Sequence, residues 1–315
     1  YAANAALSFE FMGDVVNPAN IAIIHSIFNI ASTAVLLPFY KQLEKLAILV
    51  VKDAPEKKAQ DETLTLLDER FLDTPSVAVL QCKKVAAKMA QLSRDSIMAA
   101  MGLIESFDDD KFNYVDLLES KIDRYEDTLS AYIVKLERQE LSNDDNTALS
   151  AILHNVGDLE RISDHAKNIS ESALELHQKG INFSPDAERE VGIFMNAVRE
   201  IVNLAVDSFV EKDVEMAASV EPLEEVIDEI HADVKNRHIE RLRKGICTIE
   251  LGFILSDLGT NLERVADHCS NLAICTIEAA EGAFDMHRYT SRIKKYDVDE
   301  FEQKERGFEA KYSLD

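Results

Sequence analysis

From Ser76 to about Glu281, apolar residues recur every three or four positions almost throughout. This is the period of a helix that buries one face. Glycine, proline and short polar runs interrupt the pattern at these places: Phe107–Lys111, Leu141–Asn146, Gly180–Pro185, Glu211–Asp213 and Lys244–Cys247. The pattern therefore predicts six long helices, each of about 25–35 residues, and an all-α fold for residues 76–281.

The stretch Ile21–Tyr40 has a different pattern, because it contains about 20 residues without a formal charge apart from that of a protonated His25. A helix of this length would extend for ~30 Å, the thickness of a bilayer core. Acidic residues precede the stretch and lysines follow it: Glu10, Asp14, Lys41, Lys45 and Lys52. We therefore expect a transmembrane helix at about 21–40 in the cell inner (plasma) membrane, with the residues after about 40 in the cytoplasm. A buried helix is the alternative, since Asn29 and Thr33 are polar.

The remaining segments flank these helices. Residues 1–50 are expected to be the end of a membrane domain, and residues 51–75 a charged linker with Pro55 and Pro75. Residues 282–315 are polar and charged, and we expect them to form a loosely docked or disordered tail.

The net charge of the chain is −24 at pH 7. This argues against nucleic acid as a partner, because a surface that binds phosphate backbones needs a basic patch. The four cysteines show no metal-binding or redox spacing, so we expect free thiols in a reducing compartment. The sequence has no convincing nucleophile elbow, phosphate-binding loop or dinucleotide motif, and we expect no enzyme activity.

One charged sequence occurs twice. The segments LERISDHAKN at Leu159–Asn168 and LERVADHCSN at Leu262–Asn271 are identical at six of ten positions and lie 103 positions apart. A second match, between Asp108–Asp123 and Asp213–Asp228, has an offset of 105 positions. Two offsets this close indicate one unit of about a hundred residues that is present twice.

Each copy of this unit contains three of the six predicted helices. We place repeat 1 at about 76–180 and repeat 2 at about 184–281. Long helices joined by short connections pack as antiparallel neighbours. The fold that we expect is therefore a pair of three-helix bundles.

The repeats share a pair of carboxylates in the pattern Leu-Glu-x-x-x-Asp, which occurs four times. The acidic residues are Glu119, Asp123, Glu160 and Asp164 in repeat 1, and Glu224, Asp228, Glu263 and Asp267 in repeat 2. Residues four positions apart share one face of a helix, and all four pairs lie on the same flank, near the bundle surface. Carboxylates that converge between neighbouring helices raise one another's pKa unless a cation neutralises them. Because such oxygen-rich clusters suit Mg, Ca, Mn or iron, the eight acids are candidate metal ligands.

Other interpretations of the repeated residues stay open. His165 and His268 directly follow Asp164 and Asp267, so they are either surface residues or members of a metal shell that would suit zinc or iron. Each acidic pair alone is also consistent with a solvated helix face that nearby arginines neutralise. The repeated arginines and asparagines are equally consistent with bundle contacts or helix caps: Arg161, Arg264, Asn168 and Asn271. A di-iron oxidase centre is disfavoured, because such centres use Glu-x-x-His motifs that face the bundle core.

Two three-helix bundles that each carry two ExxxD pairs and the sequence LERxxDHxxN resemble a PhoU domain, over about Ser76 to Glu281. Members of that family regulate phosphate signalling, so the resemblance implies a regulatory function. It also implies that the eight acids bind multinuclear iron or zinc clusters, or another divalent metal, on the bundle surface.

The segment Ala22–Ala47 is similar to the last membrane helix of bacterial sodium/phosphate (Na/Pi) cotransporters of the type II-related family. The shared residues are His25, Phe28, Asn29, Leu37, Pro38 and Phe39. This resemblance implies that the chain is the C-terminal part of such a transporter, whose membrane segment leads into a cytoplasmic PhoU-like domain. The Gln-Ser-Ser-Ser repeats that bind substrate and sodium in that family are absent from the sequence, so a sodium site is expected only in the missing membrane part.

The leading functional hypothesis is a cytoplasmic PhoU-like regulatory domain of a sodium-dependent phosphate transporter, whose helix bundles respond to metal or phosphate. Its expected partners are inorganic phosphate, sodium and a second copy of the chain in a homodimer. The alternative is a soluble PhoU-type signalling adaptor that binds a transporter or a sensor kinase, with Ile21–Tyr40 as a buried helix. A third hypothesis is an oligomerisation bundle that binds no ligand.

Overall fold

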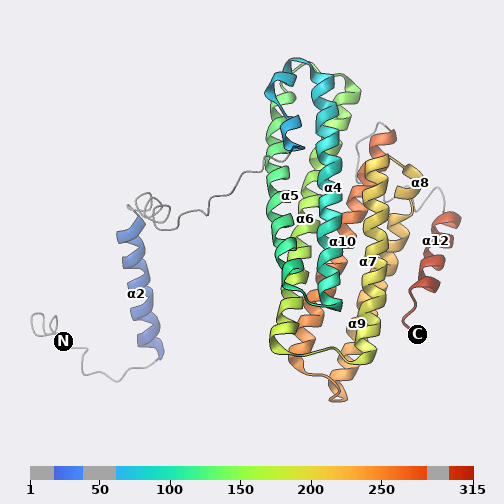
Figure 1. The fold of residues 1–315 in the computed structure, drawn as a ribbon. Coiled ribbons are helices and arrows are strands. Elements are labelled where there is room, and N and C mark those ends of the chain that lie inside the picture. The colour runs from blue at the N-terminus through green and yellow to red at the C-terminus, as the bar shows by residue number, and fades with distance from the viewer. Residues whose placement is uncertain (1–17, 38–61, 282–297) are drawn as a thin grey trace, which may run out of the picture. The chain divides into compact units, whose positions relative to one another are not determined.

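The computed structural model describes residues 18–37, 62–281 and 298–315 (Figure 1). The chain divides into two compact units, residues 1–59 and 60–315. The described part of the first unit contains helix α2, Pro18–Leu36. Most of the predicted 51–75 linker and the start of the predicted tail lie outside the described residues.

The predicted transmembrane helix is contradicted by the structure. Among the described residues, no helix is both long enough and apolar enough to cross a membrane. Helix α2 ends at Leu36, before the predicted end at Tyr40, and it carries polar residues such as His25 and Asn29 along its length. The expected location in the inner membrane is contradicted with it.

The second unit is built from helices throughout its described residues, which confirms the predicted all-α class. Its long helices are α4 (Pro75–Glu105), α5 (Asp109–Leu136), α6 (Asn143–Lys179), α7 (Pro185–Glu211), α9 (Val220–Arg243) and α10 (Ile249–Glu281). A single turn of helix, α8 (Val214–Ala217), connects α7 to α9. The observed connections overlap the predicted breaks, because glycine, proline and polar residues punctuate the chain there.

Local sequence explains where several helices begin and end. The side chains of Asp108 and Ser142 accept hydrogen bonds from backbone N–H groups in the first turns of α5 and α6. Ser184 does the same for α7, whose first residue is Pro185. Gly180 ends α6 with φ of 62°, a left-handed conformation that glycine adopts without steric cost.

Helices α4, α5 and α6 pack together as one bundle, and α7, α9 and α10 as a second, with α6 against α10 between them (Figure 1). The apolar stripes that the helical period predicts form the core. In α5 and α10 the following residues of these stripes are buried: Leu118, Ile122, Tyr125, Leu129, Leu136, Leu255, Leu258, Leu262 and Val265. Burial of these side chains supplies most of the driving force for bundle formation.

Short flanking segments cover one side of each bundle. The 3-10 turns η3 (Leu64–Leu66) and η4 (Glu69–Asp73) pack on α4, and the Tyr132 O–H of α5 donates to the Asp68 carbonyl at 3.0 Å. Helix α12 (Val298–Lys311) packs on α9. The described end of the chain therefore differs from the loosely docked or disordered tail that its polarity suggested. The apolar residues after α12, Tyr312 and Leu314, are buried.

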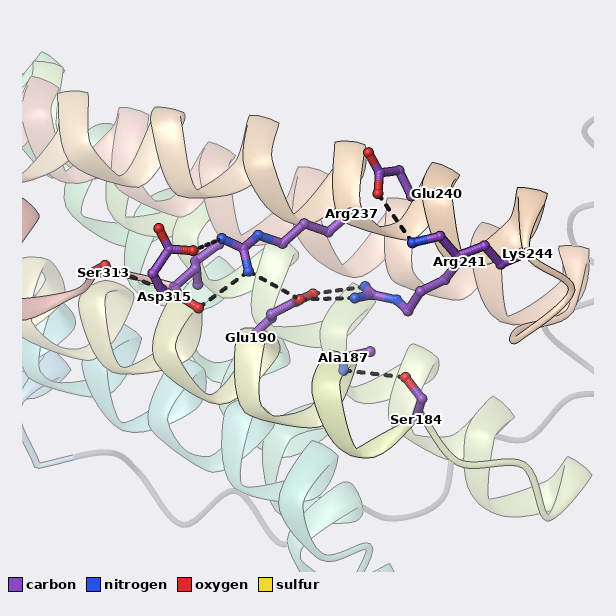
Figure 2. A network of polar contacts seen from close by, with 10 residues as sticks. Ser184, Ala187, Glu190, Arg237, Glu240, Arg241, Lys244, Ser313 and Asp315 are labelled. Atoms are coloured by element: carbon purple, nitrogen blue, oxygen red, sulfur yellow. Dashed lines mark hydrogen bonds and ion pairs between the residues drawn. The ribbon is translucent and has the colours of Figure 1, made fainter.

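A buried ion pair links α7 to α9 and, through Arg237, to the end of the described chain (Figure 2). Arg241 Nη1 donates to Glu190 Oε1 at 2.9 Å, and Arg241 Nη2 lies 2.8 Å from Glu190 Oε2. Their side chains are only 9% and 3% exposed. Arg237 lies 3.9 Å from the same carboxylate and binds Asp315 at 2.6 Å.

Two glycines of α10 let α9 approach closely. A Cβ at Gly252 would lie 2.6 Å from Nε2 of the buried His238, and one at Gly259 would lie 3.0 Å from Cδ2 of His231. The two glycines are seven residues apart on α10, and the two histidines are seven residues apart on the antiparallel α9. The imidazole rings therefore occupy the space that larger α10 side chains would need.

We predict that Gly252→Ala destabilises the protein by roughly 1–3 kcal/mol, because the added methyl group overpacks the His238 contact. The control is Gly157→Ala in α6, where no atom lies within 4 Å of the added Cβ. That change should stabilise the protein by roughly 0.5–1 kcal/mol through helix propensity. Urea unfolding measures both free energies, and equal stabilisation by the two substitutions would refute the close approach.

We also predict that Arg241→Met lowers the free energy of unfolding by about 3–5 kcal/mol, because it leaves the Glu190 carboxylate buried with only the distant Arg237. The double variant Glu190→Leu/Arg241→Met removes both charges and should lose much less. The same urea experiment provides the measurement. Equal losses in the single and double variants would show that the pair is not electrostatically coupled.

Candidate functional site

A first acidic cluster lies where α5 packs on α6. Ligand atoms of Glu119 and Asp123 from α5 and Asp164 from α6 all lie within 4.8 Å of one another. Glu160, one turn before Asp164, lies outside this group of three but is electrostatically coupled to it. Burial, and then the charge of Asp164, raises the pKa of Glu160 to about 7.

The cluster has an unmet demand for positive charge. Asp123 Oδ1 is buried and has no hydrogen-bond partner among the described residues. Burial raises the pKa of Asp123, and the charges of Glu119 and Asp164 raise it further. A carboxylate in this position is stabilised by a cation, so the donor set fits a hard metal ion.

Basic side chains meet part of this demand. Lys167 Nζ lies 2.8 Å from Glu119 and 3.3 Å from Asp116. Arg161 lies 3.4 Å from both Glu160 and Asp164. The first cluster therefore contains built-in counter-charges, which compete with any added cation.

A second cluster lies where α9 packs on α10. Ligand atoms of Glu224, Asp228 and Asp267 lie within 4.8 Å of one another, and Glu221 and Glu225 form an overlapping group with Glu224. Burial raises the pKa of Glu224 to about 8, and the charges of Glu221, Asp228 and Asp267 contribute. The pKa values of Asp228 and Glu263 are also raised, first by burial and then by Asp267.

The second cluster has fewer counter-charges than the first. The repeat places Ser270 where repeat 1 has Lys167, and the Ser270 hydroxyl donates a short hydrogen bond to Glu221. Arg264 binds Asp267 at 3.0 Å. In the described part of the chain, no lysine or arginine forms an ion pair with Glu224. The second cluster therefore has a greater need for a bound cation than the first.

The structure thus brings together three of the four predicted acids in each repeat, with Glu160 and Glu263 at the edge. Sequence reasoning missed the acids one turn earlier, Asp116 and Glu221. The sequence did contain this information, because Asp116 and Glu221 are 105 positions apart, as Glu119 and Glu224 are. A pocket of about 620 Å³ lies elsewhere, around the α6–α7 connection, and none of the eight acids lines it.

The two repeated histidines lie at the contact between α6 and α10. His165 Nδ1 lies 2.8 Å from the Asn261 Oδ1 atom, which also accepts a hydrogen bond from Asn168 at 3.1 Å. Reciprocally, His268 Nδ1 lies 2.8 Å from Asp158 Oδ1. Burial lowers the pKa of His165.

This contact has the symmetry of the repeat. Asn271 donates to Asp158 at 3.1 Å, as Asn168 does to Asn261. The imidazole rings of the two histidines stack with their centroids 5.6 Å apart. The repeated sequence therefore serves two purposes: its acids form the clusters, and its His and Asn residues join the two bundles. In this arrangement Nδ1 of each histidine contacts a side chain of the opposite helix.

Several known proteins are similar to this chain. The Thermotoga maritima "Phosphate-specific transport system accessory protein PhoU homolog 1" is 35% identical over 121 residues, 38% of this chain and 51% of that protein. The match therefore spans about half of that relative. The corresponding PhoU homologues of Aquifex aeolicus and Pseudomonas aeruginosa are 29% and 25% identical over 66% and 64% of this chain, covering 94% and 88% of their own lengths.

Solved structures show the same fold. The crystal structure of PhoU from Pseudomonas aeruginosa has a TM-score of 0.61 at 24% identity, covering 65% of this chain and 99% of that one. The PhoU structure from Streptococcus pneumoniae has a TM-score of 0.58 at 16% identity, covering 67% and 99%. The family model described as "PhoU domain" matches residues 86–173 and 193–276, one match in each repeat and together more than half of the chain. The chain belongs to the PhoU domain family.

Proposed function

We propose that this chain is a regulatory accessory protein of a phosphate transport system, with no catalytic activity of its own. The observation that carries this proposal is the match of the PhoU domain model to both repeats. The relatives named above support it, because their names describe accessory proteins of phosphate-specific transport. This is the adaptor hypothesis of the sequence analysis. The finer hypothesis, a domain of a sodium-dependent transporter, has no support from these relatives.

The proposed regulation uses divalent cations at the two acidic clusters. Glu119, Asp123 and Asp164 would hold one, and Glu224, Asp228 and Asp267 another, with Glu160 and Glu263 at their edges: the ligand set predicted from sequence. The bound metal would supply positive charge. Carboxylate oxygens suit hard cations such as manganese or iron. The iron or zinc clusters that the family resemblance implies stay a prediction, as do direct binding of phosphate or sodium and a homodimer.

The regulatory consequence follows from which helices supply the acids. Each cluster joins two helices of one bundle, α5 to α6 or α9 to α10. Without a cation, like charges across these contacts oppose close packing. Neutralising them favours the packed arrangement, so cation occupancy would alter the surface that the bundles present to a transport protein.

The first test is regulation of phosphate uptake. In a bacterium that lacks its own PhoU-type protein, expression of this chain should lower the uptake of labelled phosphate in phosphate-rich medium. A variant with Asn at Asp123, Asp164, Asp228 and Asp267 should lose this effect, whereas Glu229→Gln/Asp233→Asn should keep it. The control pair has the same ExxxD spacing but belongs to neither cluster of three. Unchanged uptake on expression of the wild-type chain would exclude the proposed function.

The second test is cation binding, with Mn²⁺ as a probe that electron paramagnetic resonance detects. We expect Asp228→Asn/Asp267→Asn to remove the tighter site and Asp123→Asn/Asp164→Asn the weaker one, because Lys167 competes only in the first cluster. Affinity should fall as the pH is lowered from 8 to 6. Glu224 and Glu160, with pKa values raised to about 8 and 7, take up protons in that range and lose their negative charge.

The Glu229→Gln/Asp233→Asn variant again serves as the control, and its Mn²⁺ binding should equal that of the wild type. A further variant, Lys167→Ser, should strengthen the first site by copying the second repeat. Equal Mn²⁺ binding by the cluster variants and the control would refute both proposed cation sites.

A further inference from the structure

The turn between α9 and α10 presents large apolar side chains to solvent. Ile246, Ile249 and Phe253 are 58%, 70% and 69% exposed. Ile249 and Phe253 are four positions apart at the start of α10, so they share one face of that helix. We call these three residues, with Arg243 and Lys244 of the same turn, the α9–α10 tip.

The duplication shows that the fold does not require apolar residues at this turn. At the offset of 103 positions that relates α10 to α6, repeat 1 has Asn143, Asn146 and Ser150. Both repeats begin the last helix of a three-helix bundle at this point. Because the same architecture is built with polar residues in repeat 1, the fold does not need the exposed isoleucines and phenylalanine of repeat 2. A group of exposed apolar side chains is typical of an interaction surface.

The tip is held in a defined conformation. Gly245 adopts a left-handed φ of 68° and closes the end of α9. The Ile246 N–H donates to the Arg241 carbonyl at 3.0 Å, and the Arg241 side chain is fixed by the buried Glu190. An apolar surface on such a fixed turn loses little conformational entropy when it binds a partner.

The tip carries two basic residues, and the acid beside it in the first turn of α10, Glu250, is paired with Lys179 at 2.6 Å. Arg243 and Lys244 are exposed, although the net charge of the chain is −24. Lys244 forms an exposed i,i+4 pair with Glu240 at 3.6 Å, whereas Arg243 forms no ion pair within the described residues. A complementary partner therefore offers an apolar surface with acidic residues at its rim. Two tips in a symmetric contact would bring their basic residues together, and this repulsion disfavours such a contact.

We propose that the α9–α10 tip docks on a protein component of the phosphate transport system, through a surface that is apolar at its centre and acidic at its rim. This inference rests on the proposed accessory function and adds the surface that carries it. It assigns the docking role to repeat 2 alone, since the matching turn of repeat 1 has no large apolar side chain among the exposed ones.

The test uses the full chain and the purified phosphate transport complex of the same organism, immobilised for a binding measurement. The test variant is Ile246→Asn/Ile249→Asn/Phe253→Ser, which copies repeat 1. Its control is Leu117→Asn, which removes another exposed apolar residue, 63% exposed on α5. We expect the triple variant to raise the Kd at least tenfold and the control to leave it unchanged. Melting temperature and Mn²⁺ binding should not change in either variant.

The outcomes separate this inference from the function on which it rests. If the wild-type chain binds and the triple variant binds equally well, the accessory function stands and the tip is excluded. If the wild-type chain does not bind the complex at all, both proposals fall. If the triple variant loses only self-association, or only binding to anionic vesicles, while it still binds the complex, the tip serves another partner and the inference is overturned.

Discussion

The packing of α6 against α10 determines where both acidic clusters lie. These two helices carry the repeated sequence, and their His and Asn side chains bind across the contact while their rings stack. The Asp residues that precede the histidines, Asp164 and Asp267, belong to the clusters on either side. A single helix–helix contact therefore positions one acid of each cluster, and the outer helices α5 and α9 supply the others.

The differences between the repeats are as informative as their similarity. Because the two copies share one backbone architecture, a residue that differs between matching positions indicates a requirement of one copy that folding does not impose. Lys167 in the first cluster becomes Ser270 in the second. Asp158 at the inter-bundle contact corresponds to Asn261, which leaves one carboxylate in an otherwise symmetric arrangement. The resulting protein has two similar charge clusters with unequal demands for a cation.

Much of the fold could be predicted because helical periodicity depends on local sequence. The breaks and the α5 core stripe from Leu118 to Leu136 follow from spacing alone. The acidic clusters could be predicted from the repeat and the geometry of a helix alone. The reciprocal histidine contact could not be predicted, because it depends on how two distant helices cross. The transmembrane prediction was wrong because it counted formal charges across Ile21–Tyr40 and gave too little weight to polar residues such as His25 and Asn29.

The adjacency of cluster acids and contact histidines gives the two bundles a physical route of communication. Asp164 and His165 are consecutive residues of α6, so a rotation of that helix that brings Asp164 nearer to α5 also displaces His165 relative to Asn261. The stacked His268 must then adjust, and Asp267 is its direct neighbour on α10. Densely packed helices do not absorb such shifts continuously. The two clusters are therefore linked by an unbroken series of contacts through the same pair of rings.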